Sequence, residues 1–170
     1  VAVSMMINAL ESLPVTYARP PSGVKAMDAG AMPSNGTRVT TRFEAVRIPL
    51  EKKGCFSVCL SSQAGCAMAC DFCATGRLGL TRHLEAWEIV AQFVAVRDEA
   101  PGAVTGAVFQ GQGEPLHNYA SVMQAAEVLS HPCGGRIAAK AITISTVGLV
   151  PAILRIAQEF RNLEFIDFGG

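Results

Sequence analysis

The sequence predicts an α/β fold in which parallel strands alternate with helices. Between residues 55 and 170, short apolar runs rich in Val, Ile and Phe alternate with longer segments whose apolar residues recur at helical spacing. A strand–helix–strand unit takes about 30 residues, so this stretch has room for about three units and a terminal strand. A complete eight-fold barrel needs about 250 residues. The chain of 170 residues therefore predicts half a barrel wall or a small open sheet, built with right-handed crossovers.

The part of the chain before this alternation has a different texture. Residues 1–37 contain four prolines and no sustained hydrophobic period, so we interpret them as a poorly ordered leader or the remnant of an N-terminal accessory domain. Residues 38–54 include the alternating run VTTRFEAVRIPL, which predicts a strand in a β-rich linker segment. Residues 55–170 then form the first half of a barrel domain.

The first strand and helix of that domain flank a loop rich in cysteine. The run CFSVCL, residues 55–60, predicts a strand that ends where the loop begins. The segment LEAWEIVAQFVAVRDE, residues 84–99, predicts a helix with Trp87, Val90, Ala91 and Val94 on one face and Pro101-Gly102 as its stop.

Two more strand and helix pairs follow. AVTGAVFQG predicts a buried strand over 103–111, and NYASVMQAAEVLS predicts a helix over 118–130 with Asn118 as its cap. The sequence then predicts a strand in KAITIST, a third helix in GLVPAILRIAQEF and a last strand in LEFIDF. This order supports the parallel arrangement.

Composition limits the classes of function. Lys and Arg together number 14, as do Asp and Glu, so the protein has no overall basic field to attract nucleic acid. Residues 36–83 hold seven basic and three acidic side chains, which we interpret as ordinary solvated groups. The apolar stretch 141–154 is too short for a bilayer and contains Pro151. With no signal segment evident, we expect a cytoplasmic protein without a membrane partner.

The six cysteines are unevenly spread, and three of them lie close together. Without a secretory signal, such a cluster indicates metal-binding or redox-active thiols rather than a disulfide framework. Cys66, Cys70 and Cys73 have the spacing C-x3-C-x2-C, which can wrap around one compact centre of a soft metal. Three cysteines on a 4Fe-4S cluster leave one iron without a protein ligand, open to a substrate or cofactor.

Other readings of the cysteines remain open at this point. Structural zinc takes four protein ligands, so a zinc site would need Cys59 or His83 in addition to the three clustered cysteines. The thiols could also be packed or merely reactive. Cys55 and Cys133 are interpreted as ordinary small apolar residues.

Longer strings around these cysteines resemble a known family. C-x3-C-x2-C after the first strand of a βα repeat resembles the radical S-adenosylmethionine (SAM) superfamily. The strings CLSSQAGCAMACDFCATGRLGLTRHLEAWEIVAQ, GQGEPLHN and ITISTVGLVP resemble its dual-specificity 23S rRNA and tRNA adenine-C2 methyltransferases, and adenine-C8 methyltransferases are related. The resemblance covers residues 43–151. It implies a partial radical SAM barrel with three to four of the family's six βα units.

The resemblance implies which residues hold the cofactors. Cys66, Cys70 and Cys73 would hold the 4Fe-4S cluster, whose open iron binds SAM and whose electron cleaves SAM to a 5′-deoxyadenosyl radical. Gly113 and Glu114, in GQGEP, would meet the methionine end of SAM. Ser145 would also contact SAM. From the residues alone, GQGEP could be only a turn, and Ser145 could cap the following helix.

The resemblance also implies two catalytic residues. Cys59 lies where the family has a cysteine that removes a proton from the adenine carbon and resolves a covalent protein–RNA intermediate by forming a disulfide. Glu44 aligns with a family glutamate given a proton-acceptor role, although the linker between these two residues is one residue longer here. A strand glutamate that faces solvent is the alternative for Glu44.

Family members carry a second cysteine near their C-terminus that receives the methyl group, and this chain shows none at that place. We therefore expect a truncated member or a fragment. The predicted partners are 23S rRNA or tRNA and an electron donor such as a flavodoxin-like protein. A second hypothesis is a cluster-binding and SAM-binding module that is not a methyltransferase.

Overall fold

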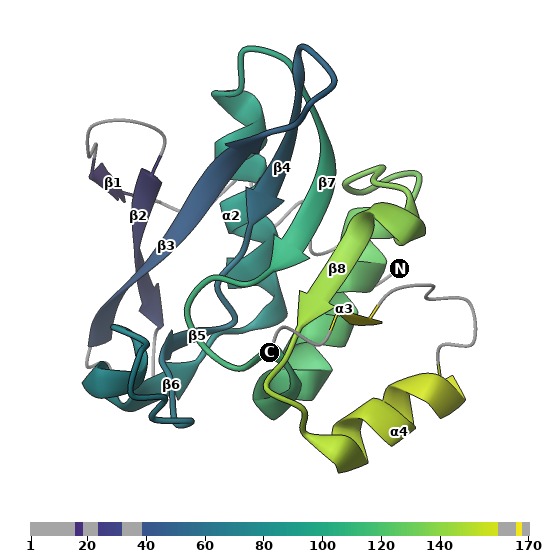
Figure 1. Cartoon of the computed structure of the whole chain (residues 1–170). Coiled ribbons are helices and arrows are strands. Elements are labelled where there is room, and N and C mark those ends of the chain that lie inside the picture. The colour runs from purple at the N-terminus through teal and green to yellow at the C-terminus, as the bar shows by residue number, and fades with distance from the viewer. Residues whose placement is uncertain (1–15, 19–23, 32–38, 160–165, 168–170) are drawn as a thin grey trace.

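The computed structural model describes residues 16–18, 24–31, 39–159 and 166–167. Its main element is a mixed sheet with the strand order β1-β2-β3-β4-β7-β8-β9 (Figure 1). The strands of this sheet are β1 (Thr16–Ala18), β2 (Val24–Ala31), β3 (Val39–Pro49), β4 (Cys55–Cys59), β7 (Ala103–Phe109), β8 (Ile142–Ser145) and β9 (Ile166–Asp167). Strands β1 to β4 pair antiparallel, whereas β4, β7, β8 and β9 are parallel. The predicted α/β class with parallel strands is confirmed, and the described strands form an open sheet rather than a closed barrel.

The N-terminal strands differ from expectation. No element was expected within residues 1–37, yet β2 pairs with β3 from Val24 opposite Val46 to Ala31 opposite Val39. The reason is that β3 would otherwise be an edge strand, and an adjacent extended segment satisfies its backbone hydrogen bonds. The rest of the segment 1–37, apart from β1 and β2, lies outside the described residues.

Helices α2 (Ala86–Asp98) and α3 (Tyr119–Ser130) pack against each other behind the sheet in Figure 1. The buried face of α2 is shifted from the predicted stripe. Val90 and Ala91 are buried as predicted, but Trp87 and Val94 are only half-buried, and Ile89 and Phe93 are fully buried instead. The N-terminus of α2 is closed by a capping box between Glu85 and Glu88. The buried Glu88 carboxylate also accepts two hydrogen bonds of 2.7 Å from Arg82, so this arginine is not an ordinary solvated side chain.

Asn118 does not cap α3 through its side chain, contrary to the prediction. Its amide nitrogen instead donates to the carbonyl oxygens of Ser62 at 2.8 Å and Leu84 at 2.7 Å. Because both carbonyls belong to buried loop segments, they need a donor more than the partly exposed start of the helix does. Asn118 thus joins the start of α3 to the segments before and after the cysteine loop.

Helix α4 (Val150–Glu159) lies beside the carboxyl end of β8 (Figure 1). Ile156 is buried, while Val150 and Leu154 are exposed. The helix is tied to the start of α3 by Tyr119, whose hydroxyl donates to Glu159 at 2.8 Å. None of the helices in the described parts of the chain is long and apolar enough to span a bilayer.

Short elements shape the carboxyl edge of the parallel strands. The small hairpin of β5 (Gln63–Gly65) and β6 (Leu80–His83) brackets the cysteine loop. Single 3₁₀ turns lie within that loop, before α3 and before β8, as η1 (Gly76–Leu78), η2 (Pro115–Asn118) and η3 (Ala139–Ala141). Because β4, β7 and β8 are parallel, the loops that leave them converge at one edge.

Candidate functional site

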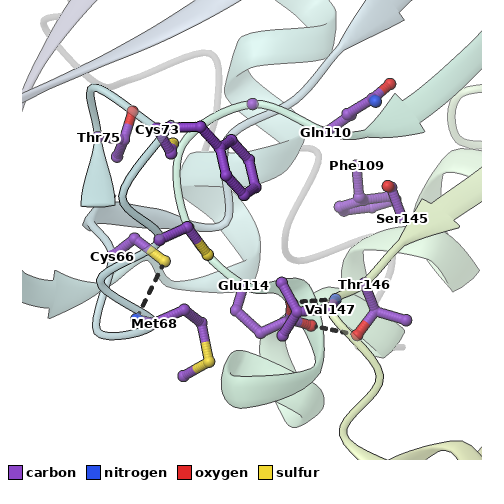
Figure 2. A pocket seen from close by; sticks show the side chains of 14 residues that line it. Cys66, Met68, Cys73, Thr75, Phe109, Gln110, Glu114, Ser145, Thr146 and Val147 are labelled. Atoms are coloured by element: carbon purple, nitrogen blue, oxygen red, sulfur yellow. Dashed lines mark hydrogen bonds between the residues drawn. The ribbon is translucent and has the colours of Figure 1, made fainter. Parts of the chain in front are cut away.

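A pocket of about 280 Å³ lies at this edge, between the cysteine loop and the loops that follow β7 and β8 (Figure 2). Figure 2 shows Cys66 and Cys73 on one side and Ser145 and Thr146 on the other, with Glu114 between them. The lining includes six of the eight residues named by the sequence analysis: Cys66, Cys70, Cys73, Gly113, Glu114 and Ser145. Tertiary structure therefore gathers residues that are up to 79 positions apart in the chain.

Tight backbone contacts hold the cysteine loop in shape. The backbone N–H of Cys66 donates to Gly79 at 3.0 Å, and that of Cys73 donates to Cys70 at 3.0 Å. Gly65 has φ +81°, and a side chain there would collide with the carbonyl of Gly79. A Cβ on Gly76 would lie 2.9 Å from the backbone nitrogen of Cys70, so this glycine is needed for close approach rather than for an unusual φ.

The outer part of the loop is clamped by an arginine. Arg77 donates from its Nη2 and Nε atoms to the carbonyl oxygen of Asp71, at 2.9 and 3.3 Å. Ala69, which precedes Cys70, has a left-handed φ of +52°. Such a conformation costs an alanine about 1–2 kcal/mol, so the surrounding contacts must hold it. The loop is therefore a shaped structure and not an extended linker.

The three loop cysteines are free thiols that line the same pocket. Cys66 is buried, and Cys70 and Cys73 are half-buried. Within the described ranges, no group of three or more His, Cys, Asp and Glu side chains surrounds a single-ion position. Three soft thiol donors around one pocket fit a 4Fe-4S cluster, whose irons are spread over a cube and each need one ligand.

Glu114 joins two walls of the pocket. Its side chain is buried, and its Oε1 accepts hydrogen bonds from the N–H of Leu116 at 2.9 Å and the hydroxyl of Thr146 at 2.6 Å. Its Oε2 accepts one from the N–H of Val147 at 2.9 Å. A carboxylate has about four lone-pair positions, so Oε2 keeps one acceptor position for a further donor. Glu114 thus fixes the β8–α4 loop to η2 and retains capacity for a cation.

Gly113 is required by its neighbour Gln63. Gly113 has φ +99°, and a Cβ on it would lie 2.5 Å from the Cβ of Gln63. The N–H of Glu114 donates to the Oε1 of Gln63 at 2.9 Å. The turn after β7 is therefore pressed against β5, and only glycine fits there.

The segment Ser61–Gln63, which the sequence analysis did not single out, connects the site to the rest of the fold. Ser61 donates from its hydroxyl to the carbonyl of Glu44 at 2.6 Å and accepts from the N–H of Gln112 at 2.9 Å. The amide of Gln92, on α2, pairs with the backbone of Ser61 at 2.8 and 2.9 Å. The only sequence signal was a run of polar residues directly after a buried strand.

Cys59 and Glu44 do not line the pocket. Cys59 is the last residue of β4 and is half-buried. Burial raises the pKa of its thiol, and a hydrogen bond from the backbone of Gln110, a pocket residue, lowers that pKa by less. Cys59 therefore lies directly behind the pocket wall. Glu44 lies on β3 with its side chain exposed, and its carbonyl, not its carboxylate, bonds toward the site.

Comparison with known proteins adds family information. The model of the radical SAM superfamily matches residues 60–169. A probable RNA methyltransferase of Anaeromyxobacter sp. (strain Fw109-5) is 58% identical over 118 residues, which is 69% of this chain and 35% of that protein. A probable RNA methyltransferase of Myxococcus xanthus is 54% identical over 69% of this chain and 33% of its own length. The probable dual-specificity RNA methyltransferase RlmN of Picosynechococcus sp. is 47% identical over the same two shares.

A solved structure is similar to this chain over almost its whole length. The crystal structure of a radical SAM methyltransferase from Sphaerobacter thermophilus has a TM-score of 0.73 and 33% sequence identity, covering 96% of this chain and 49% of that one. The chain spans about a third of the length of the curated relatives it matches.

Proposed function

Because the chain belongs to the radical SAM superfamily, we propose that it carries the cluster-binding and SAM-binding part of an RNA methyltransferase. The proposed reaction is methylation of an adenine at C2, in 23S rRNA, tRNA or both. The observation that carries the proposal is the pocket in which three free cysteines face Gly113, Glu114 and Ser145 at the carboxyl edge of parallel strands. The names of the similar proteins support RNA as the substrate class.

Each pocket residue has a proposed task. Cys66, Cys70 and Cys73 hold the 4Fe-4S cluster through their thiolates. When bound, the cluster supplies an open iron for SAM and the electron that cleaves SAM to a 5′-deoxyadenosyl radical. The remaining acceptor position of Glu114 suits the ammonium of the methionine end, since a carboxylate makes its strongest hydrogen bonds to cations. The polar backbone of the turn beside it, at Gly113, suits the same end.

Ser145, which also lines the pocket, and two residues outside it, Cys59 and Glu44, have further proposed roles. Ser145, at the end of β8, offers a hydroxyl from the opposite wall. Cys59 is proposed as the proton acceptor for the adenine carbon, because a thiol whose pKa is raised by burial yields a more basic thiolate once deprotonated. Glu44 is proposed as a proton acceptor near the surface, where its side chain is exposed.

Further proposals concern the second partner, the location and the domain organisation of the protein. An electron donor such as a flavodoxin-like protein is the proposed second partner, and the cytoplasm is the proposed location. The proposed organisation places residues 55–170 in the barrel domain and 38–54 in a β-rich linker, preceded by the segment 1–37. In that arrangement β3 adds an antiparallel strand beside β4, at the edge of the parallel strands.

The test is anaerobic reconstitution of the full chain, followed by incubation with SAM, a chemical reductant and 23S rRNA or tRNA. We expect four irons per chain and cleavage of SAM to 5′-deoxyadenosine, measured by mass spectrometry. Cys66→Ala should lose both, whereas Cys133→Ala, at an exposed cysteine outside the pocket, should keep both. Stoichiometric zinc without iron would overturn the cluster assignment. Methylation also needs the methyl-receiving cysteine, so it is tested with a longer gene product that supplies this cysteine. There, 2-methyladenosine in the RNA supports the proposal, unmodified RNA favours a SAM-binding module of another kind, and 8-methyladenosine favours the C8 relatives.

A further inference from the structure

The amide of Gln63 has a fixed orientation inside the protein. Its side chain is fully buried, and its Oε1 accepts the hydrogen bond of 2.9 Å from the backbone N–H of Glu114. A backbone N–H can only donate, so the oxygen of the amide must point toward Glu114. The nitrogen of the amide must then point the other way.

On that other side the amide nitrogen meets two histidines. The Nε2 of Gln63 lies 3.0 Å from Nδ1 of His83, on β6, and 3.3 Å from Nδ1 of His117, on η2. The amide has two N–H donors, and both are directed at ring nitrogens. Each Nδ1 must therefore be an unprotonated acceptor, which places the proton of each neutral ring on Nε2. Both imidazoles are thereby held in one tautomer.

The two rings lie edge to face, with centroids 5.0 Å apart and an interplanar angle of 80°. Burial and the proximity of His117 lower the pKa of His83, which favours its neutral form. The charged side chains next to His83 have hydrogen-bond partners, and Arg82 also donates from its Nη1 to the backbone carbonyl of His83 at 3.1 Å. Arg82 on β6 is paired with Glu88 of α2, and Glu85 accepts a hydrogen bond from the Trp87 indole.

We propose that Gln63 is a positioning residue for the Gly113–Glu114 turn, and that it holds this turn only while His83 and His117 are both neutral. This inference rests on the proposed function, in which that turn receives the methionine end of SAM. The side chain of Gln63 acts on the turn twice, through its contact with Gly113 and through its hydrogen bond to Glu114.

Protonation of either histidine puts an N–H where Gln63 already presents an N–H. The amide cannot escape by rotating, because its nitrogen would then face the N–H of Glu114. One hydrogen bond of the amide is lost in either orientation. If the amide stays, it releases the protonated ring and its own orientation is no longer fixed; if it rotates, it releases the N–H of Glu114, and in both cases the turn is held less firmly. A histidine whose folded pKa is lowered has its neutral form fully present above the ordinary value of about 6.5. For His83, whose pKa is lowered, the contact with Gln63 is therefore complete above that pH and weakens as the pH falls through the lower folded value.

The experiment measures two properties of the cluster-loaded full chain between about pH 5 and 8, a range that spans the imidazole transition. The first is the hydrogen-exchange protection of the Glu114 N–H, by residue-resolved mass spectrometry, after correction for the intrinsic exchange rate. The second is the dissociation constant for SAM. Loss of one buried hydrogen bond corresponds to about a tenfold change in an equilibrium. We expect both protection and affinity to fall about tenfold toward the acidic end.

Variants separate this mechanism from a merely structural role. Asparagine Oδ1 lies close to the place of histidine Nδ1 and accepts without titrating, so His83→Asn combined with His117→Asn should keep the affinity and abolish the acidic loss. Gln63→Glu presents an acceptor to the rings, which can receive an N–H from a protonated histidine, so the loss at acidic pH should disappear. His131→Asn, at a histidine that accepts from the N–H of Cys133, is the control and should retain the original profile.

Equal pH profiles of Glu114 exchange in the original chain and in the double asparagine variant would overturn the inference. The double variant changes two exposed residues, so it remains informative if Gln63→Glu does not fold. If the chain binds no SAM at any pH, the cofactor role within the proposed function fails. The exchange of the Glu114 N–H then still decides whether Gln63 and its histidines hold the turn.

Discussion

Replacement of Gly113 by alanine should destabilise the protein by two separable effects. Gly113 has φ +99°, and a left-handed conformation costs a residue with a Cβ about 1–2 kcal/mol. The new Cβ would also lie 2.5 Å from the Cβ and 2.7 Å from the Oε1 of Gln63. Because the Cβ of Gln63 is fixed to strand β5, the strand or the turn must move, which adds about 1–3 kcal/mol of overpacking. We expect Gly113→Ala to lower the free energy of unfolding by about 2–5 kcal/mol.

Gly148 provides the matched control. Its φ of +98° is nearly the same, but a Cβ on it would meet nothing within 4 Å. Gly148→Ala should therefore cost only the conformational part, about 1–2 kcal/mol. Urea unfolding of both variants, followed by circular dichroism, measures the difference. If the two substitutions agree within about 0.5 kcal/mol, the size of an ordinary surface effect, the steric argument for Gly113 is refuted.

Further predictions concern three other side chains. Glu114→Gln places an amide nitrogen against backbone or hydroxyl donors and should cost about 2–3 kcal/mol in urea unfolding. The same change at the exposed Glu127 should cost less than about 0.5 kcal/mol, and equal costs would contradict the role of Glu114 in fixing the β8–α4 loop to η2. Cys59, whose thiol pKa is raised by burial, should react with iodoacetamide near neutral pH more slowly than the exposed Cys133, as peptide mass spectrometry can measure. Burial and its acceptor carboxylate raise the pKa of Tyr119 to about 12, so an ultraviolet titration should show a transition there that Tyr119→Phe lacks.

Much of the parallel sheet could be predicted from the sequence. Strands β4, β7 and β8 and helices α2 and α3 fall inside the predicted segments, because each has a hydrophobic pattern long enough to show its period. Strands β5 and β6 were missed. They span three and four residues, too few for a period, and they exist because the ends of the cysteine loop pair with each other.

The polar residues show the same division. The sequence analysis took Asn118 as a helix cap on the basis of its local position, but its partners are carbonyls 34 and 56 positions away. Ser61 and Gln63 were not singled out at all, yet they connect β3, α2 and the turn after β7. No local pattern reveals such partners, since a buried polar group takes whichever donor or acceptor the fold brings near it.

The sequence by itself determined the α/β class, the cysteine spacing and the glycine turns, because each depends on residues close together in the chain. The resemblance built on those motifs predicted a 4Fe-4S cluster and SAM as cofactors, and the family match confirms both. Only the tertiary structure decided that Cys66, Glu114 and Ser145 share one pocket while Glu44 stays on the surface. The physical reason is the sheet: parallel pairing brings the ends of β4, β7 and β8 to one edge, and buried hydrogen bonds then fix the loops that leave it.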